Sequence, residues 1–267
     1  MGKKKGRPEI EKKSGASEKR IGLFGGTFNP IHLGHLRGAE EIREISGLDQ
    51  VIFIPAAIPP HKVAEQVIEA KHRLEMVRLA TTTNPFFSTT DIELSRPDKS
   101  YSIDTIRYFR ERSQNDLFFI LGRDAFMEIG TWKEFQELFS LCNFIVMTRP
   151  GFEKTLSGPV QVPGLGRDPG RSGRDAASLF PEVLSPVFRY DPDIKGWIHP
   201  SGHTLHFQEI TMLDISSTKI RELIERGESV KYLISGEVEA YIQEHGLYSP
   251  GSRPESKFVQ DKAHRSP

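Results

Sequence analysis

The chain of 267 residues contains a single cysteine, carries no net charge and has no long apolar run. Because Cys142 is alone, the chain cannot form an internal disulfide, which is typical of proteins in a reducing cytosol. No run reaches the roughly 18 apolar residues that a transmembrane helix needs. The N-terminus also lacks the apolar segment of a secretory signal. These absences predict a cytoplasmic protein without a membrane partner.

The charge balance argues against nucleic-acid binding by the whole protein. The 36 basic and 36 acidic side chains cancel, whereas nucleic-acid-binding proteins carry a basic excess that displaces counterions from phosphates. The basic residues are concentrated in 1–20, which has almost no apolar side chains. We expect 1–19 to be a basic mobile tail and 249–267 to be a polar C-terminal tail. A nucleic-acid role for the basic tail is the alternative; we favour a solvated extension and expect no nucleic-acid partner.

Short β-rich runs alternate with helix-period segments over the first half of the chain. Continuous apolar runs such as 118–121 are typical of strands that are covered on both faces. Strands are predicted at 20–25, 50–55, 86–94, 117–122 and 143–148. Helices are predicted near 34–46, 69–82, 102–113 and 133–140. The alternation indicates an α/β fold with a doubly wound, Rossmann-like parallel sheet.

The alternation stops after residues 149–151. Residues 151–203 are expected to form an irregular excursion, because 151–175 is rich in Gly, Pro and Arg and has no periodicity. A strand at 204–210 and C-terminal helices at 216–226 and 236–245 are predicted to follow. We therefore expect a single domain over 20–248.

A Gly-rich string follows the first predicted strand and reads Gly-Gly-Thr-Phe-Asn-Pro-Ile-His-Leu-Gly-His over residues 25–35. Gly25 and Gly26 carry no Cβ, so the backbone there can pass close to a ligand. His32 and His35 lie three residues apart at a helix start, where N–H groups and the helix dipole favour an anion. Each histidine alone is more typical of a structural residue, but the whole string indicates a site for phosphate oxygens.

A second string, Asp-Ile-Ser-Ser-Thr-Lys-Ile-Arg at 214–221, begins a late predicted helix. Ser216, Ser217 and Thr218 are typical N-cap residues, and on their own they indicate only a helix start. Arg221 lies four residues after Ser217 and is therefore expected on the same helix face. Hydroxyl groups, N-terminal N–H groups and a guanidinium on one turn form a second anion site, which suits a polyphosphate.

Together the two strings resemble the HxGH nucleotidyltransferase superfamily and, more closely, the bacterial nicotinate-nucleotide adenylyltransferases. Further matches in family order are IPAAIPPHK at 54–62, HRLEM at 72–76, ELSRPDKSYSIDT at 93–105, LGRD at 121–124, TW at 131–132, RPG at 149–151 and GLY at 246–248. The resemblance covers about residues 20–248 and implies one nucleotidyltransferase domain. It also implies adenylyl transfer from ATP to nicotinate mononucleotide, which yields nicotinate adenine dinucleotide and pyrophosphate in NAD biosynthesis.

The resemblance implies roles in ATP binding for residues of both strings. His32, His35 and Arg221 would be catalytic, with His35 stabilising the charge that develops around the α-phosphate. The β,γ-phosphates would be bound by Ser216, Ser217, Thr218 and Arg221. The junction of the two nucleotides would be lined by Gly25, Gly26, Thr27 and Phe28. The adenosine ribose would be bound by Gly122 and Asp124.

The resemblance places the acceptor against a different set of residues. Trp132 would stack on the pyridine ring, and backbone N–H groups around Tyr101 and Ser102 would bind the nicotinate carboxylate. Lys62 and Arg149 would add positive charge near the phosphates. Structural alternatives stay open from the residues alone, with Trp132 in the core, Asp124 as a helix cap and Lys62 in an exposed loop.

The implied reaction needs no protein nucleophile, and no serine or cysteine of the chain is an obvious one. The acceptor phosphate is already an anion and would attack the α-phosphorus of ATP in line, so the protein supplies positioning and charge stabilisation. Mg²⁺ is expected on the ATP phosphates rather than in a protein cage, because the strings offer no cluster of carboxylates. His199, His203 and His206 also lack the cysteine or acidic partner that would complete a zinc pattern.

Other functions stay open from the sequence. The acceptor could instead be nicotinamide mononucleotide, phosphopantetheine or another phosphorylated metabolite within the same superfamily. A non-catalytic nucleotide sensor, or a nucleic-acid-binding adaptor that uses the basic tail, is a different class of protein. Both require the histidines and Arg221 to serve no reaction, which their presence in intact strings disfavours. The oligomeric state, a homo-oligomer included, is also open.

Overall fold

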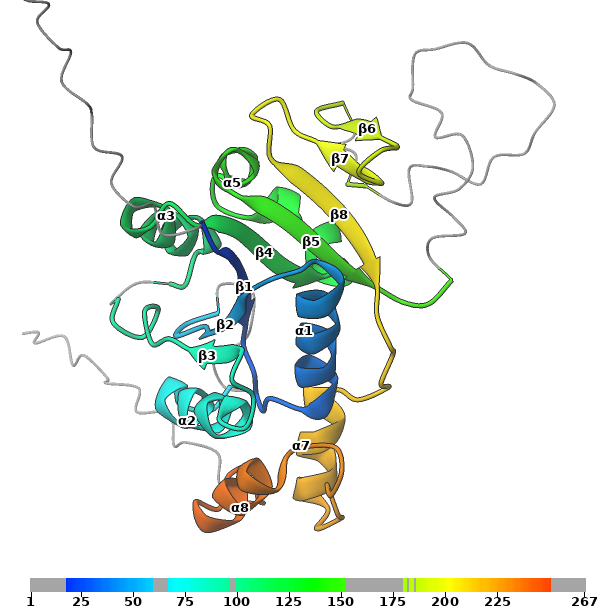
Figure 1. The fold of residues 1–267 in the computed structure, drawn as a ribbon. Helices are drawn as coiled ribbons and strands as arrows, with labels where there is room; N and C mark the ends of the chain where they lie inside the picture. Colours follow the sequence, from blue (N-terminus) through cyan, green and yellow to red (C-terminus); the bar gives the residue numbers. More distant parts are fainter. Residues whose placement is uncertain are drawn as a thin grey trace, which may run out of the picture.

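The computed structural model of the protein describes residues 18–59, 67–96, 99–151, 180–181, 183–184 and 186–250. Within these residues the chain forms an eight-stranded sheet with helices on both faces (Figure 1). Most of each expected tail and most of the Gly-rich stretch after Gly151 lie outside the described residues.

The sheet is parallel except at one edge. Its strands are β1 (Arg20–Gly26), β2 (Gln50–Pro55), β3 (Phe87–Thr89), β4 (Asp116–Gly122), β5 (Asn143–Thr148), β6 (Arg189–Asp191), β7 (Gly196–Ile198) and β8 (Thr204–Glu209). Their order is β3-β2-β1-β4-β5-β8-β7-β6. β2 and β4 pair in parallel with the two sides of β1, whereas β7 pairs antiparallel with both β8 and β6. The chain order therefore reverses at β1, as in doubly wound folds.

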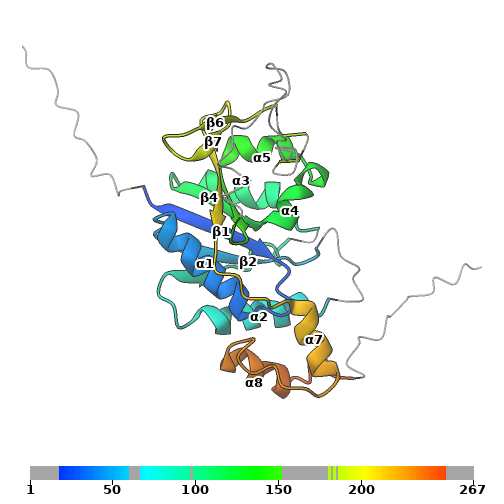
Figure 2. The ribbon, with the colours of Figure 1, turned by 90° about the vertical axis from the view of Figure 1, so that its right-hand side faces the viewer.

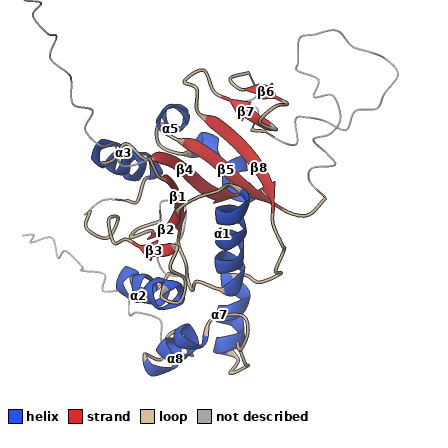
Figure 3. Ribbon diagram, in the orientation of Figure 1, coloured by secondary structure: helices blue, strands red, loops and turns tan. Residues whose placement is uncertain are grey.

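Helices cover both faces of the sheet, as Figures 2 and 3 show. They are α1 (Leu33–Ile45), α2 (Ala70–Thr81), α3 (Ser102–Arg112), α4 (Arg123–Met127), the 3-10 turn η2 (Ile129–Thr131), α5 (Phe135–Leu141), α7 (Ser217–Glu225) and α8 (Gly236–Glu244). Leu23 of β1 and Phe126 of α4 belong to the hydrophobic core on one face, and Phe24 of β1 and Ile42 of α1 belong to the core on the other. Because both faces are buried, the strands are continuously apolar. No helix in the described part of the chain is long and apolar enough to cross a membrane.

Hydrophobic periodicity predicted the parallel strands and the main helices. The expected α/β, doubly wound sheet is confirmed, with the antiparallel edge as the addition. The strand expected at 86–94 is shorter, because the chain turns at Asp91, whose carbonyl accepts hydrogen bonds from the N–H groups of Leu94 and Ser95. The short helix α4 and the turn η2 were not predicted, since each spans about one turn and leaves no periodic pattern.

The expectation of an irregular excursion over 151–203 is wrong for its C-terminal part. β6 and β7 form a hairpin that extends the sheet. Phe180 and Trp197 are buried, and their ring centroids lie 4.6 Å apart. The sequence shows little sign of this hairpin because its strands are only three residues long, too short to show a period-2 pattern.

We predict that Trp197→Ala lowers the free energy of unfolding by about 3–5 kcal/mol, since it leaves a cavity beside Phe180. The neighbouring Tyr190→Ala is the matched control, because 41% of Tyr190 is exposed and less packing is lost. Urea denaturation of both variants measures the difference. Equal losses would show that the hairpin is not part of the core.

Candidate active site

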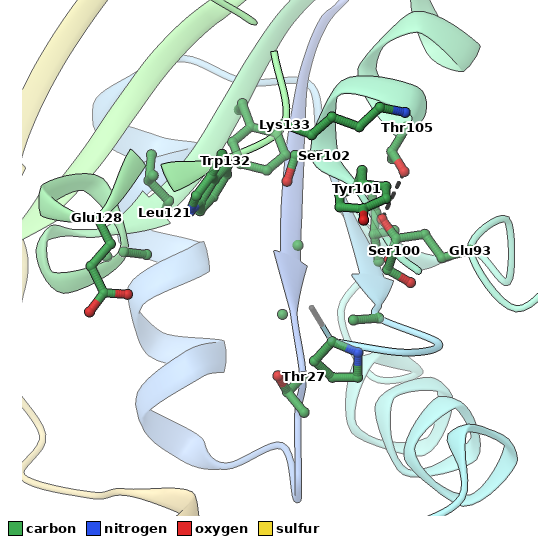
Figure 4. A pocket seen from close by; sticks show the side chains of 18 of the residues that line it. Thr27, Glu93, Ser100, Tyr101, Ser102, Thr105, Leu121, Glu128, Trp132 and Lys133 are labelled. Atoms are coloured by element: carbon green, nitrogen blue, oxygen red, sulfur yellow. Dashed lines mark hydrogen bonds between the residues drawn. The ribbon is translucent and has the colours of Figure 1, made fainter. Parts of the chain in front are cut away.

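The carboxyl ends of β1, β2 and β4 enclose a pocket of ≈ 290 Å³. Gly25 and Gly26 line it from β1, Ile54 from β2, and Leu121 and Gly122 from β4. This is the place where the chain order of the sheet reverses, and open α/β sheets bind their ligands in the crevice at such a point. The predicted nucleotide junction and the predicted acceptor pocket therefore meet in one cavity (Figure 4).

Gly26 leaves room for the ring of Phe28, two residues later in the chain. A Cβ at Gly26 would lie 2.8 Å from the ring of Phe28, which turns back beneath the strand end with a left-handed φ of 48°. Phe28 is buried and packs edge-on against Phe24, with 5.7 Å between the ring centroids. Thr27 lines the pocket, but Phe28 does not, so the ring supports the loop from within the core.

The two histidines stack on each other at the start of α1. Their ring centroids are 3.6 Å apart, and the backbone N–H of His32 donates to Nδ1 of His35 over 3.2 Å. Because Nδ1 of His35 accepts this hydrogen bond, the proton of a neutral ring is assigned to Nε2, which makes Nε2 the donor. The backbone N–H of Leu33, which is one of the donors at the helix start, donates to the carbonyl of Leu233.

His32 is buried and neutral. Burial disfavours the charged imidazolium and lowers the pKa of His32 from 6.5 to about 4. Within the described part of the chain, its Nδ1 is a buried polar atom that makes no hydrogen bond. Buried polar atoms are nearly always paired in native proteins, so this nitrogen is a candidate for contact with a ligand.

The second string docks directly onto the first. Ser217 donates its hydroxyl to the carbonyl of Pro30 over 2.8 Å, and Nη1 of Arg221 donates to the carbonyl of Asn29, also over 2.8 Å. The start of α7 is thereby held beside the start of α1, as the ribbon shows (Figure 1). The bonded residues are 187 and 192 positions apart in the sequence, so the two predicted anion sites meet only in the folded chain.

Within α7, one of the three predicted N-cap residues caps the helix, and Ser217 and Arg221 lie on one face, as expected. Ser216 is the N-cap, and its hydroxyl accepts a hydrogen bond from the N–H of Lys219. Arg221 contacts the hydroxyl of Thr218, 3.3 Å from Nη2, rather than that of Ser217. Ser216 and Thr218 are exposed, whereas Ser217 and Arg221 are partly buried by the docking.

Arg73 is a supporting residue that the sequence analysis did not single out. Its side chain is buried and donates to four backbone carbonyls, those of Ile68, Thr27, Ala56 and Ala57. Burial lowers its pKa to about 10, so it stays charged at neutral pH. The guanidinium thus ties the loop after β1 to the loop after β2. The sequence does hold a sign of this role. Arg73 occupies a position on the buried face of α2, in line with Met76, Val77 and Ala80, where an apolar residue is expected.

Besides its contact with Arg221, Asn29 is held by Tyr248, near the C-terminal end of the described chain. Its Oδ1 accepts a hydrogen bond from the hydroxyl of Tyr248 over 2.9 Å and another from the N–H of Ile68. Tyr248 belongs to the late Gly-Leu-Tyr match, which had no assigned role. Its contact explains why such a distant segment accompanies the first string.

The predicted acceptor residues Tyr101, Ser102 and Trp132 all line the pocket. Tyr101 is the N-cap of α3 and Ser102 its first residue, so backbone donors of a helix start are at the pocket wall. Trp132 is half-buried and packs edge-on against Phe119, with its other surface available to the pocket.

The pocket wall also holds a carboxyl group that was not predicted. Glu93 is buried and accepts a hydrogen bond from the hydroxyl of Thr105 over 2.7 Å. Burial raises its pKa above the ordinary value for glutamate. Arg96 donates to the same hydroxyl oxygen of Thr105 over 3.0 Å and contributes a positive charge near Glu93.

Two residues that were predicted at the ribose or the acceptor, Asp124 and Arg149, do not line this pocket. Neither do the two histidines nor the residues of the second string, which lie at the starts of α1 and α7. Asp124 is exposed on α4, although Gly122 beside it does line the pocket. Arg149 is exposed just after β5. Lys62 lies outside the described residues. Among the residues that are described, no three His, Cys, Asp or Glu side chains come together in a group that could hold a metal ion.

Loss of the Arg73 guanidinium is expected to destabilise the loops around the pocket. We predict that Arg73→Met lowers the free energy of unfolding by about 3 kcal/mol, because buried carbonyls lose their donor. Arg78→Met on the same helix is the control, since Arg78 is exposed and its ion pairs are 3.6 Å or longer. Urea denaturation measures both. Similar losses in the two variants would contradict a special role for Arg73.

The burial of His32 predicts a pH-dependent stability. Unfolded His32 takes up a proton near pH 6.5, whereas the folded side chain does so only near pH 4. The stability that the neutral side chain contributes to the fold is therefore complete above pH 6.5. As the pH falls toward 4, the free energy of unfolding decreases by up to about 3 kcal/mol. We expect the difference in unfolding free energy between wild type and His32→Gln to change by this amount between pH 7 and pH 4. A difference that does not vary with pH would show that His32 is not buried.

The sequence matches the cytidylyltransferase-like family over residues 23–223. It is 44% identical over 231 residues to the probable nicotinate-nucleotide adenylyltransferases of Pelobacter propionicus and of Geobacter metallireducens, covering 86% of this chain and 98% of each relative. A solved structure of nicotinic acid mononucleotide adenylyltransferase from Plasmodium falciparum, complexed with NaAD, matches at 19% identity with a TM-score of 0.61, covering 86% of this chain and 98% of that chain. This likeness confirms the α/β fold. The chain therefore belongs to the cytidylyltransferase-like family, among the nicotinate-nucleotide adenylyltransferases.

Proposed function

We propose that the protein transfers the adenylyl group of ATP to nicotinate mononucleotide, forming nicotinate adenine dinucleotide and pyrophosphate. The observation that carries the proposal is the docking of Ser217 and Arg221 on the loop before His32 and His35, next to a pocket lined by Trp132. Two helix starts with a guanidinium suit a triphosphate, and a half-buried aromatic wall suits a flat ring. The names of the curated relatives support the same reaction.

The reaction proceeds by in-line displacement at the α-phosphorus. An oxygen of the acceptor phosphate forms a bond to the α-phosphorus while the bond from that phosphorus to the β-phosphate oxygen breaks, and pyrophosphate leaves. Gly25, Gly26 and Thr27 let both nucleotides approach the backbone at the end of β1. No protein side chain forms a covalent bond, so the residues act by positioning and by stabilising charge.

The histidines and α7 act on different phosphates of ATP. Nε2 of His35 donates a hydrogen bond to the α-phosphate as negative charge develops there, and neutral His32 lies stacked against His35 to hold its ring. Ser216, Thr218 and Arg221 contact the β- and γ-phosphates that leave as pyrophosphate, with the start of α7 contributing backbone donors.

Mg²⁺ would be held by the ATP phosphates rather than by a cage of protein side chains. The described side chains offer no cluster of three acidic, histidine or cysteine ligands, and this donor set suits an ion carried by phosphates and water rather than by the protein. When bound, it would neutralise charge on the triphosphate.

The direct test is pyrophosphate release from Mg-ATP with purified protein and either nicotinate or nicotinamide mononucleotide. We expect turnover with the acid form and a lower kcat/KM with the amide form. Turnover with the amide alone would keep the chemistry and reject the acceptor. Release with neither would reject the proposed function.

We predict that His35→Ala lowers kcat by about 10²- to 10³-fold, because its hydrogen bond strengthens as charge develops in the transition state. His35→Gln, whose amide N–H can reach toward the position of Nε2, should recover part of the loss. Steady-state kinetics with Mg-ATP measures both variants, and circular dichroism checks that they fold. A kcat for His35→Ala within a few-fold of wild type would remove His35 from the mechanism.

A further inference from the structure

Lys133 is the positively charged side chain among the described residues that line the pocket. It directly follows Trp132, and its Nζ lies 4.9 Å from the centroid of the Tyr101 ring. Figure 4 shows its side chain extending from the Trp132 side of the pocket toward α3, whose N-cap is Tyr101. The ammonium group therefore lies over the ring of Tyr101, one of the residues that are assigned to the pyridine end of the acceptor.

The ion pairs of Lys133 are long and partly exposed to solvent. Its Nζ is 3.3 Å from Oδ2 of Asp104 and 3.9 Å from Oε1 of Glu134. Glu134 has a closer partner in Arg107, which binds both Glu134 and Glu137 over 2.5 Å. About two fifths of the Lys133 side chain is exposed (41%), and such pairs contribute little energy, so the ammonium can turn to an incoming carboxylate.

Two carboxyl groups, those of Glu93 and Glu128, also line the pocket. Glu93 accepts a hydrogen bond from Thr105, and the positive charges of Arg96 and Arg73 act on it within the wall. Glu128 is exposed and lies on the other side of Trp132 from Lys133 (Figure 4).

The two candidate acceptors differ by one negative charge on the pyridine ring. Backbone N–H groups at the start of α3 can donate to the oxygen of either a carboxylate or a carboxamide, so they discriminate weakly. A positive charge nearby separates the two, because it attracts the carboxylate and gains nothing from the neutral amide.

We propose that Lys133 is a specificity-determining residue, whose ammonium group favours a pyridine mononucleotide carrying a carboxylate over the corresponding amide. The inference rests on the proposed function, because it concerns the choice of acceptor at that same pocket. Asp104 has the opposite effect, since it competes with the substrate carboxylate for Lys133.

The test compares kcat/KM for nicotinate and nicotinamide mononucleotides, with Mg-ATP saturating, in the full-length protein and three variants. In Lys133→Met the acid-to-amide ratio should fall roughly fivefold, through a higher KM for the acid. Lys133→Arg should keep the ratio near that of wild type. Asp104→Asn should raise it, because the lysine loses its competing partner. If the amide is not turned over, its inhibition constant against the acid replaces its kcat/KM.

Opposite shifts in Lys133→Met and Asp104→Asn are not expected from a general loss of structure, which would weaken both acceptors together. An unchanged ratio in Lys133→Met, with the wild type using the acid, would overturn the assignment of Lys133 and leave the proposed function intact. A wild type that uses neither mononucleotide would overturn both. A fall in the ratio of equal size in Lys133→Arg would show that shape, not charge, is the cause.

Discussion

The proposed phosphate site depends on the hydrogen bonds from Ser217 and Arg221 to the carbonyls of Pro30 and Asn29, because they join two helix starts. Each helix start alone carries only backbone donors and about half a positive charge, which binds a phosphate weakly in water. Side by side, with the two histidines and a guanidinium, they can surround a triphosphate. The rest of the described structure can be understood as the framework that keeps these two segments in contact.

Two buried groups keep the first loop in the shape that this contact requires. The guanidinium of Arg73 connects Thr27 with Ala56 and Ala57, so the ends of β1 and β2 cannot separate at the pocket. Tyr248 holds the side chain of Asn29 from the C-terminal segment. Neither residue lines the pocket, yet both determine where its backbone lies. A charged guanidinium in this position is stable because carbonyl oxygens accept its hydrogen bonds.

The sequence predicted the parts of the site that repeat a local pattern. Continuous apolar runs located β4 and β5, and the glycine and histidine string located the start of α1. It could not predict the contact between Ser217 and Pro30, because a hydrogen bond across 187 residues leaves no local pattern. The inward turn of Phe28 was missed for a similar reason, since an aromatic residue in a loop reads equally well as a ligand contact.

The docking of α7 is tested most directly through Ser217, whose hydroxyl donates to Pro30. Isothermal titration calorimetry with a non-hydrolysable ATP analogue would compare wild type, Ser217→Ala and Ser229→Ala, the last being an exposed serine that follows α7. We expect Ser217→Ala to weaken binding about tenfold, because the two helix starts lose one of their links. Equal affinity in all three proteins would contradict the claim that this contact builds the nucleotide site.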